Sequence, residues 1–298
     1  MDAPFKLHWY SNDETRPPYG ETSLISPDPR LITPIGFPPP WEKRPWIYGV
    51  MVVSANGVTA WDRKSKTDDP VWFILGQNPL RPERLEDKLR VLYLYTFGDA
   101  SVGAQTVRDQ EEVVLDIQEP GKEEPAFSGI YHKLYDLRLS RGLPRHSRNI
   151  VYTPSGRDLD FSHPIFNTRG IQTIIVTTQA GKDKLLAAGA GTKGIEFIVA
   201  GKTEMTPGNL IAAHEKLFSD YGTRYLDCMG GETMLNLLHQ AGILDEVFVT
   251  ITDVVVRPEE HTGVKYIVDF KAAGARLIAE GGVPGSSWKV QRWRFNER

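Results

Sequence analysis

The stretch RYLDCMGGETMLNLLHQAGILDEVFVTIT, residues 224–252, decides the fold. Residues 225–228 are mostly apolar and predict a short buried strand, which ends in the pair Gly230-Gly231. Apolar residues then recur every three or four positions, as on one face of a helix. Gly242 is typical of the position just beyond a helix C-terminus, and residues 247–252 predict a second strand. The stretch therefore predicts a strand–helix–strand unit of an α/β protein.

A glycine pair between a strand and a helix has two readings. Neither glycine carries a Cβ, so a ligand or another backbone can approach closely. The N–H groups and the positive dipole end of the helix N-terminus favour an anion such as phosphate. The alternative is a tight strand-to-helix turn with no ligand, and this stretch alone does not decide between the two.

Length and composition bound the class of protein. The chain has 298 residues, 40% hydrophobic and 24% charged, which is typical of a soluble protein with one large domain or two small ones. Its net charge of −3 gives no general attraction to nucleic acid or to an anionic membrane. A single cysteine, Cys228, excludes an internal disulfide. No run of about 18 apolar residues occurs, so we expect no transmembrane helix and a cytoplasmic location.

The remaining chain alternates between strands and helices. Residues 1–43 are rich in proline and aromatic residues and predict an arm that packs on the domain or on a partner subunit, the alternative being a flexible tail. Residues 44–298 predict one α/β domain with a mixed central sheet flanked by helices and a C-terminal antiparallel hairpin. The expected strands are 46–54, 99–103, 150–153, 171–177, 195–200, 266–270, 275–279 and 288–295, and the expected helices are 82–96, 182–188 and 207–221.

One long segment, residues 109–148, predicts an irregular insertion. Its first half is acidic, and its second half carries Arg138, Arg141, Arg145 and Arg148. Such a charge reversal usually marks a solvated loop. The alternative is a phosphate site, because clustered arginines bind phosphate well.

Several common motifs are absent or misplaced. A G-x-G-x-x-G pattern at Gly189, Gly191 and Gly194 follows a predicted helix and precedes a strand, which is the reverse of the dinucleotide-binding order. The seven histidines show no metal-ligand spacing, so we expect no metal site. No nucleophile motif is present, and Cys228 lies in an apolar strand.

Five segments, taken in order, resemble the pyrimidine reductase family of riboflavin biosynthesis. That family is the reductase half of a bifunctional deaminase-reductase and is similar in fold to dihydrofolate reductase. The resemblance covers about residues 44–295, and the segments are SANG (54–57), DASVGAQTVRD (99–109), IVYTPSGRDLDFSHPIF (150–166), IIVTT (174–178) and YLDCMGGETMLNLLHQAGILDEVFVTI (225–251).

The resemblance implies an NADPH-dependent oxidoreductase, commonly a homodimer, that reduces a C=N or ribose Schiff-base group of a ribosylaminopyrimidine phosphate. It implies substrate contacts at Ser54, Arg108 and Asp109 and places Asn56 at the catalytic position. The cofactor contacts that it implies are Gly103, Thr106, Val107, Thr177, Thr178, Gly230, Gly231, Glu232, Thr233 and Met234.

Three departures from the family pattern leave other functions open. Asn56 replaces the usual aspartate, and Met229 replaces the usual glutamate before the glycine pair. Residues 109–116 are acidic where the family has an arginine-bearing substrate segment, and carboxylates repel a phosphorylated substrate. The alternatives are a dihydrofolate-reductase-like enzyme with another substrate or a deazaflavin donor, and a nucleotide-binding relative without catalysis.

Overall fold

The computed structural model describes residues 6–10, 36–59, 71–76, 78, 81–110, 113–118, 127, 129–229, 231–260 and 269–296. The chain divides into two compact units. Unit 1 comprises residues 1–39, 49–94 and 245–298, and unit 2 comprises residues 40–48 and 95–244. The expected boundary between an arm and a domain after residue 43 does not coincide with this division and stays a prediction.

Unit 2 is built on a parallel sheet. Its strands follow the order β2-β7-β3-β4-β5-β6, with β2 contributing its first three residues. The pairs β7–β3, β3–β4, β4–β5 and β5–β6 are parallel. All residues of β4 and β5 are buried, as expected when both faces of a parallel sheet are covered. The strands are β2 (Trp46–Val53), β3 (Asp99–Gly103), β4 (Asn149–Thr153), β5 (Thr173–Thr177), β6 (Glu196–Val199) and β7 (Tyr225–Cys228).

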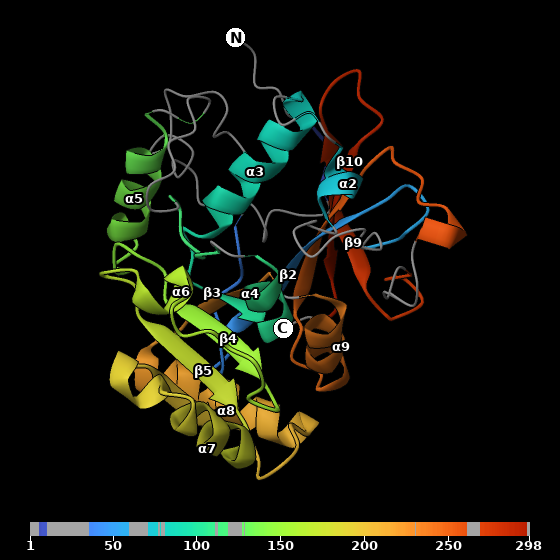
Figure 1. Cartoon of the computed structure of the whole chain (residues 1–298). Coiled ribbons are helices and arrows are strands. Elements are labelled where there is room, and N and C mark those ends of the chain that lie inside the picture. Colours follow the sequence, from blue (N-terminus) through green and yellow to red (C-terminus); the bar gives the residue numbers. More distant parts are fainter. Residues whose placement is uncertain are drawn as a thin grey trace. The chain divides into compact units, whose positions relative to one another are not determined.

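Helices connect these strands, and in Figure 1 α7 and α8 lie beside β4 and β5. The expected start of α8 is confirmed: Thr206 and Asn209 form a reciprocal capping box around Pro207, and the helix ends at Gly222 with φ 69°. The helices of unit 2 are α4 (Ala104–Asp109), α5 (Tyr131–Ser140), α6 (Pro164–Asn167), α7 (Gln179–Ala187), α8 (Pro207–Tyr221) and α9 (Glu232–Gln240).

The G-x-G-x-x-G pattern forms a helix-to-strand connection, as its order predicted. A single 3-10 turn, η4 (Ala190–Lys193), separates α7 from β6. Gly189 and Gly194 flank the turn with φ values of 99° and 65°, a left-handed conformation that favours glycine. These glycines therefore serve the turn and do not open a helix toward a ligand.

The expectation of an irregular insertion over 109–148 is wrong for residues 131–140, which form α5. Leu134, Leu137 and Arg138 lie on the buried face of that helix. The helix was missed because its buried face includes a charged residue, so its apolar spacing is incomplete in the sequence. The other described residues of the segment form turns and extended chain.

Unit 1 is the antiparallel part of the fold, with the strand order β1-β9-β10-β8-β2. Its pairs β1–β9, β9–β10 and β10–β8 are antiparallel, which confirms the expected mixed α/β sheet and its C-terminal hairpin. Residues 261–268, which include most of the strand expected at 266–270, lie outside the described residues. The elements of unit 1 are β1 (Lys6–Tyr10), α2 (Trp72–Leu75), α3 (Pro82–Leu94), β8 (Glu246–Ile251), η5 (Pro258–Glu260), β9 (Arg276–Gly282) and β10 (Lys289–Arg294).

Residues 6–10 of the expected arm belong to a sheet, since β1 pairs with residues 279–282 of β9.

An ion triad joins strand β8 to strand β10 in unit 1. The buried carboxylate of Glu246 accepts from Arg292 and Arg294, each through a contact of 2.6 Å. Arg292 bonds to one carboxylate oxygen and Arg294 to the other, so removing either arginine would leave a buried oxygen without its donor. The triad therefore holds β10 in register on β8.

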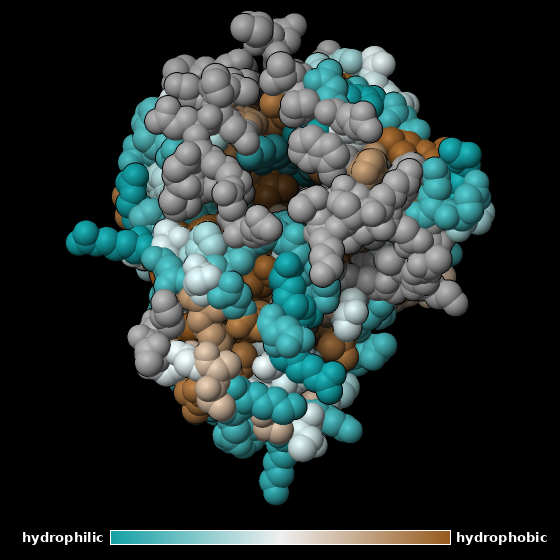
Figure 2. All heavy atoms as spheres, viewed as in Figure 1, coloured by the Kyte–Doolittle hydropathy of each residue, from teal (hydrophilic) through white to brown (hydrophobic). Residues whose placement is uncertain are grey.

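The described surface is mixed in character. Figure 2 shows hydrophilic and hydrophobic side chains interspersed on the face viewed. Large hydrophobic residues exposed among the described residues are Leu139, Leu186 and Val255. No helix in the described part of the chain is long and apolar enough to cross a membrane.

Candidate functional site

The candidate site lies at one edge of the parallel sheet of unit 2. Register pairs Ser101 with Cys228 and Gly103 with Tyr152, and Thr153 pairs with Thr177. Because these pairs are parallel, the strands β7, β3, β4 and β5 all end at the same edge. The structure therefore brings together three of the segments that the sequence singled out, namely 103–107, 177–178 and 229–234.

Gly231 begins α9 at this edge and leaves open space where a side chain would project. It is the N-cap residue, with φ −62°, and no side chain caps the helix. A Cβ built on Gly231 meets no atom within 4 Å. The conformation does not require glycine, so the open space is a property of the site and not of the turn. Gly230 and the side chain of Glu232 lie outside the described residues.

Gly103 has the same properties at the end of β3. It is the N-cap of α4 with φ −75°, no side chain caps the helix, and a Cβ there also meets no atom within 4 Å. Backbone hydrogen bonds tie the two strand ends together, because Met229 N donates to Ser101 O at 2.8 Å. Two open glycine positions thus stand at the ends of neighbouring parallel strands.

Other helices of unit 2 begin differently. The hydroxyl of Thr178 accepts from Gly181 N at the start of α7, and that of Thr206 accepts from Asn209 N at the start of α8. Helix α5 lacks a side-chain cap, but its N-cap residue Ile130 is fully buried. Open glycine N-caps therefore distinguish α4 and α9 from these three helices.

The other expected cofactor residues near these glycines differ in how far they are buried. Thr106 is half-buried and Thr233 is exposed. Val107 and Met234 are buried in the core, with exposures of 3% and 5%. The side chains of Val107 and Met234 thus support the helices and are not available to a ligand.

Thr177 and Thr178 are buried at this edge of the sheet, where their hydroxyls bond to the backbone at the end of β4. Both are fully buried, and their hydroxyls donate to Thr153 O at 2.6 Å and to Pro154 O at 2.8 Å. Gly181 packs against them so closely that a Cβ there would lie 2.2 Å from Thr177 Oγ1. The burial argues against the direct cofactor contact expected of these threonines, which instead shape the edge.

Ser54 and Asn56 lie in unit 1, where their side chains form a bridge of hydrogen bonds to the backbone of residues 58 and 256. Asn56 Nδ2 donates to Val256 O at 2.7 Å, and its Oδ1 accepts from Val256 N at 3.1 Å and from Ser54 Oγ at 2.8 Å. Ser54 Oγ also accepts from Val58 N at 2.9 Å. The amide of Asn56 is therefore engaged in structure, and its geometry gives no support to the expected catalytic role.

This bridge explains why an amide replaces the family's aspartate. Val256 presents one donor and one acceptor, and an amide side chain matches both, whereas a carboxylate only accepts. We predict that Asn56→Asp lowers the free energy of unfolding by about 1–2 kcal/mol, because Val256 O loses its donor. Urea unfolding measures this change. Unchanged stability with lost turnover would instead restore a catalytic role for Asn56.

A cavity of about 420 Å³ lies beside α4 in unit 2. Arg108, expected to bind substrate, lines it and donates to Arg157 O at 3.1 Å and to Gln105 Oε1 at 2.7 Å. Asp109, the other expected substrate residue of α4, accepts from Gln105 Nε2 at 2.7 Å. The lining residues are Val107, Arg108, Asp158, Leu159, Asp160, Ser162, His163 and Pro164.

Residues 158–164 were not identified as site residues from the sequence. Asp158 adopts a left-handed backbone conformation with φ 52°, which is uncommon for a residue with a side chain. His163 Nε2 donates to Gln110 O at 2.6 Å, and His163 Nδ1 accepts from Ile165 N at 3.3 Å. The only available signal was the quoted 150–166 segment, in which no residue type by itself indicates a cavity.

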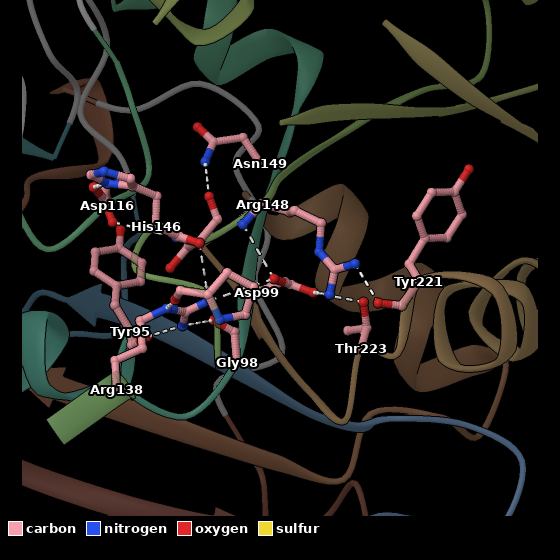
Figure 3. A network of polar contacts seen from close by, with 12 residues as sticks. Tyr95, Gly98, Asp99, Asp116, Arg138, His146, Arg148, Asn149, Tyr221 and Thr223 are labelled. Carbon is pink, nitrogen blue, oxygen red and sulfur yellow. Dashed lines mark hydrogen bonds and ion pairs between the residues drawn. The ribbon is translucent and has the colours of Figure 1, made fainter. Parts of the chain in front are cut away.

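Two of the arginines of 138–148, Arg138 and Arg148, are engaged inside unit 2 and not in a solvated loop. Figure 3 shows Arg138 and Arg148 inside a network around Asp99. Arg148 contacts Asp99 at 2.7 Å, Thr223 Oγ1 donates to Asp99 at 2.6 Å, and Arg138 is fully buried. Because their charges are used internally, these two arginines give no support to a phosphate site.

The histidines with described contacts also act in structure. Burial lowers the pKa of His214 to about 4, so the ring is neutral. Its Nδ1 donates to Leu210 O at 2.7 Å, and its Nε2 accepts from the Tyr152 hydroxyl at 2.8 Å. Among the described residues no group of three or more His, Cys, Asp or Glu side chains is placed to hold a metal ion.

Comparison with known proteins identifies the fold. No protein-family model matches the sequence, and no curated protein matches it. A pyrimidine reductase-like protein from Corynebacterium diphtheriae is similar over 85% of this chain and 93% of its own, with 17% identity and a TM-score of 0.55. The riboflavin biosynthesis reductase Rib7 of Saccharomyces cerevisiae is similar over 86% of this chain and 92% of its own, with 13% identity and a TM-score of 0.50.

The Acinetobacter baumannii RibD is similar over 86% of this chain, with 11% identity and a TM-score of 0.55, and this chain spans 59% of its length. The fold is thus that of pyrimidine reductases. The resemblance to the riboflavin-biosynthesis reductases that the sequence motifs indicated is confirmed at the level of structure, and so is the expected dihydrofolate-reductase-like fold.

Proposed function

We propose that the protein is an NADPH-dependent reductase that transfers a hydride to a C=N or ribose Schiff-base group of a ribosylaminopyrimidine phosphate or a related compound. The observation that supports this proposal most strongly is the pair of open glycine N-caps, Gly103 and Gly231, at neighbouring strand ends. The similarity of fold to pyrimidine reductases agrees with the proposal.

The two glycines fit a dinucleotide. The N–H groups of the first helical turn have no partner within a helix, and the dipole makes that end positive. At Gly231 and Gly103 no side chain competes for these groups, so a pyrophosphate has room to approach the backbone of α9 and α4. Bound NADPH supplies the hydride, and the task of the chain is to hold cofactor and substrate in position.

Two carboxylates of the acidic segment 109–116 are less of an obstacle to a phosphorylated substrate than the sequence indicates, whereas Glu111 and Glu112 lie outside the described residues. Asp116 is buried, with an exposure of 3%, and it accepts from the Tyr135 hydroxyl and from His146 Nδ1, each at 2.7 Å. Asp109 is bonded to Gln105. These two carboxylates are therefore not directed at a substrate, and Arg108 is the cation at the cavity beside α4.

The same cavity favours a second candidate function. Asp158 and Asp160 line it together with Arg108, so its carboxylates outnumber its arginine. Such a lining suits an uncharged substrate better than a phosphate. A dihydrofolate-reductase-like oxidoreductase acting on an unphosphorylated compound is therefore the alternative, and a homologue that binds NADPH without turnover is the third outcome.

We predict that Gly231→Leu raises the dissociation constant of NADPH at least tenfold, which is about 1.4 kcal/mol. A Cβ at Gly231 meets no atom within 4 Å and its φ of −62° suits any residue, so the fold should be retained. Titration with NADPH, followed by its fluorescence, measures the constant, and circular dichroism checks the fold.

Gly208→Leu is the matched control. Gly208 lies in the first turn of α8, and a Cβ there likewise meets no atom within 4 Å, but Thr206 already caps that helix. The control should bind NADPH as the wild type does. Equal binding by Gly231→Leu would mean that the glycine is only part of a turn, and absence of NADPH or NADH binding by the wild type would remove the reductase proposal.

Oxidation of NADPH on addition of substrate separates the candidates. Oxidation with the ribosylaminopyrimidine phosphate supports the first candidate, and NADPH binding without that oxidation favours the second or third. We also propose a homodimer, as the family resemblance implies, and light scattering of the full chain measures its mass. A monomeric mass would contradict this proposal.

A further inference from the structure

A histidine–carboxylate pair in unit 2 lies at the edge of the parallel sheet where the strands begin, opposite the edge that carries the glycine site. His146 lies just before β4, and Gly170 lies just before β5. The side chain of Asn149, the first residue of β4, bonds to both backbone groups of Leu115, at 2.9 and 3.0 Å. This tie brings Asp116 to the start of β4, where it meets His146 (Figure 3).

Asp116 decides which nitrogen of His146 carries the proton. Its buried Oδ2 accepts from the Tyr135 hydroxyl at 2.7 Å and lies 2.7 Å from His146 Nδ1. A carboxylate only accepts hydrogen bonds, so Nδ1 donates, and Nε2 holds the lone pair of the neutral ring. An imidazole oriented in this way by a buried carboxylate is the arrangement that prepares a histidine to act as a base or a nucleophile.

The second nitrogen of His146 is open. His163 and His214 bond through both ring nitrogens, whereas within the described residues His146 bonds through Nδ1 alone. The side chain of His146 is 31% exposed and that of Asp116 only 1%, so the exposed part of the ring is the edge away from Nδ1. Gly170 borders this edge, since a Cβ there would lie 3.6 Å from Cδ2 and 3.9 Å from Nε2. A residue without a side chain therefore leaves Nε2 uncovered on that side.

The charge beside the ring favours an anionic reactant. The Arg145 guanidinium lies 4.2 Å from the centre of the Tyr135 ring, and the centre of that ring lies 5.5 Å from the centre of the His146 ring. Arg145 is exposed and has no carboxylate partner among the described residues. Arginine binds the oxygens of a phosphoryl group through charge-assisted hydrogen bonds. A nucleophilic nitrogen with such a cation nearby suits a phosphoryl group better than an uncharged one.

We propose that His146 Nε2 is a phosphorylation site, which takes a phosphoryl group from a donor with a phosphorus–nitrogen bond. The Nε2 lone pair forms the new bond to phosphorus. The phosphorus–nitrogen bond of the donor breaks, and its protonated nitrogen leaves with the electron pair as a neutral amine. The ring becomes a cation whose Nδ1–H still donates to the Asp116 carboxylate, which stabilises the charge. One phosphorus–nitrogen bond replaces another, so the transfer needs no further reactant, and it does not depend on the proposed reductase function.

The test treats the full chain with phosphoramidate, a small donor of this class, and follows the phosphoryl group on each histidine by mass spectrometry. We expect His146 to be labelled roughly tenfold faster than His132, an exposed histidine of α5 that serves as the internal reference. Asp116→Asn should slow the labelling of His146 roughly tenfold or more, because an amide also donates and no longer fixes the tautomer. Tyr135→Phe removes only the other bond to Asp116 and should leave the rate within about threefold.

Two further variants complete the test. His146→Asn should abolish the fast label, and Arg145→Met should slow it, because the cation that favours the phosphoryl group is lost. Circular dichroism checks folding. If Asp116→Asn does not fold, the rates of His146 and His132 in the wild-type chain, together with the effect of Arg145→Met, still decide. Equal labelling of the two histidines, no label on His146, or an undiminished rate in a folded Asp116→Asn would overturn the phosphorylation site and leave a histidine that only supports the sheet edge.

Discussion

Replacing Arg138 by methionine is expected to lower the free energy of unfolding by about 3–5 kcal/mol. Arg138 is fully buried in unit 2, where its guanidinium donates to four backbone carbonyls. It also lies 3.8 Å from Asp99. The acceptors are Tyr95 O at 2.6 Å, Gly98 O at 2.5 Å, Pro144 O at 2.6 Å and His146 O at 3.3 Å.

The size of the effect follows from what the substitution leaves behind. A methionine preserves much of the apolar stem but removes every donor, so buried carbonyls lose their partners and Asp99 loses part of its compensating charge. Equilibrium urea unfolding, followed by tryptophan fluorescence and circular dichroism, measures the change.

Arg145→Met is the matched control for this prediction. Arg145 is exposed, and its guanidinium lies 4.2 Å from the centre of the Tyr135 ring. An exposed contact of this kind contributes about 0.5–1 kcal/mol. A small effect of Arg138→Met, comparable to that of the control, would show that the buried hydrogen bonds of Arg138 contribute little to stability.

A second large effect is expected for the pH dependence of stability in Glu86→Gln. Burial holds the pKa of Glu86 at about 8, against 4.5 for an ordinary glutamate. Between these two values the unfolded chain releases the proton while the folded chain keeps it, so this residue makes the protein less stable as the pH rises from 4.5 to 8. Below pH 4.5 both states are protonated and the effect vanishes.

Each pH unit across that window is worth about 1.4 kcal/mol, so the total is on the order of 4–5 kcal/mol. Glutamine does not titrate, so the stability of Glu86→Gln relative to the wild type should increase steadily between pH 4.5 and 8. Urea unfolding at a series of pH values measures the difference. Glu215→Gln, at an exposed position of α8, should follow the wild type at every pH. Parallel curves for Glu86→Gln and the wild type would show that Glu86 ionises normally in the folded protein.

The parts of the fold that sequence reasoning found are those encoded by neighbouring residues. The opening stretch 224–252 contains β7, α9 and β8, and Gly242 has the left-handed φ of 68° expected beyond a helix end. Thr206 and Pro207 likewise predict the start of α8, because they are its N-cap and its first residue. Such caps and glycines act locally and are visible without the rest of the chain.

The parts that were missed depend on distant partners. Helix α5 was missed because Arg138 is buried by carbonyls 40 and 43 residues away in the sequence. Helix α3 was predicted within residues 82–96, but its buried residues include Glu86, Asp87 and Arg90 beside Leu89 and Leu92. Charged residues are normally assigned to the solvent face, so nothing in the sequence indicated a polar interior.

The same difference between local signals and distant partners applies to the predicted site residues. Gly103 and Gly231 were predicted from a local signal, a glycine at a strand end, and the structure places both where parallel strands end. Their contact with a cofactor stays a prediction. Thr177, Thr178 and Asn56 were assigned to ligands, yet their side chains bond to Thr153, Pro154 and Val256. A hydroxyl or an amide in a sequence does not show whether its partner will be a ligand or another segment of the backbone.

The division into two units has a consequence for the order in which the chain acquires structure during synthesis. Unit 2 is almost continuous, since residues 95–244 need only the short segment 40–48 to complete it. Unit 1 consists of three separated pieces, and β8, β9 and β10 all belong to the last of them. Domains generally fold as they leave the ribosome. Unit 2, which carries the glycine site, is therefore complete while unit 1, which contains α3, still lacks the last part of the chain. A ribosome stalled once residue 245 has left the exit tunnel would present a folded unit 2 with unit 1 unfinished.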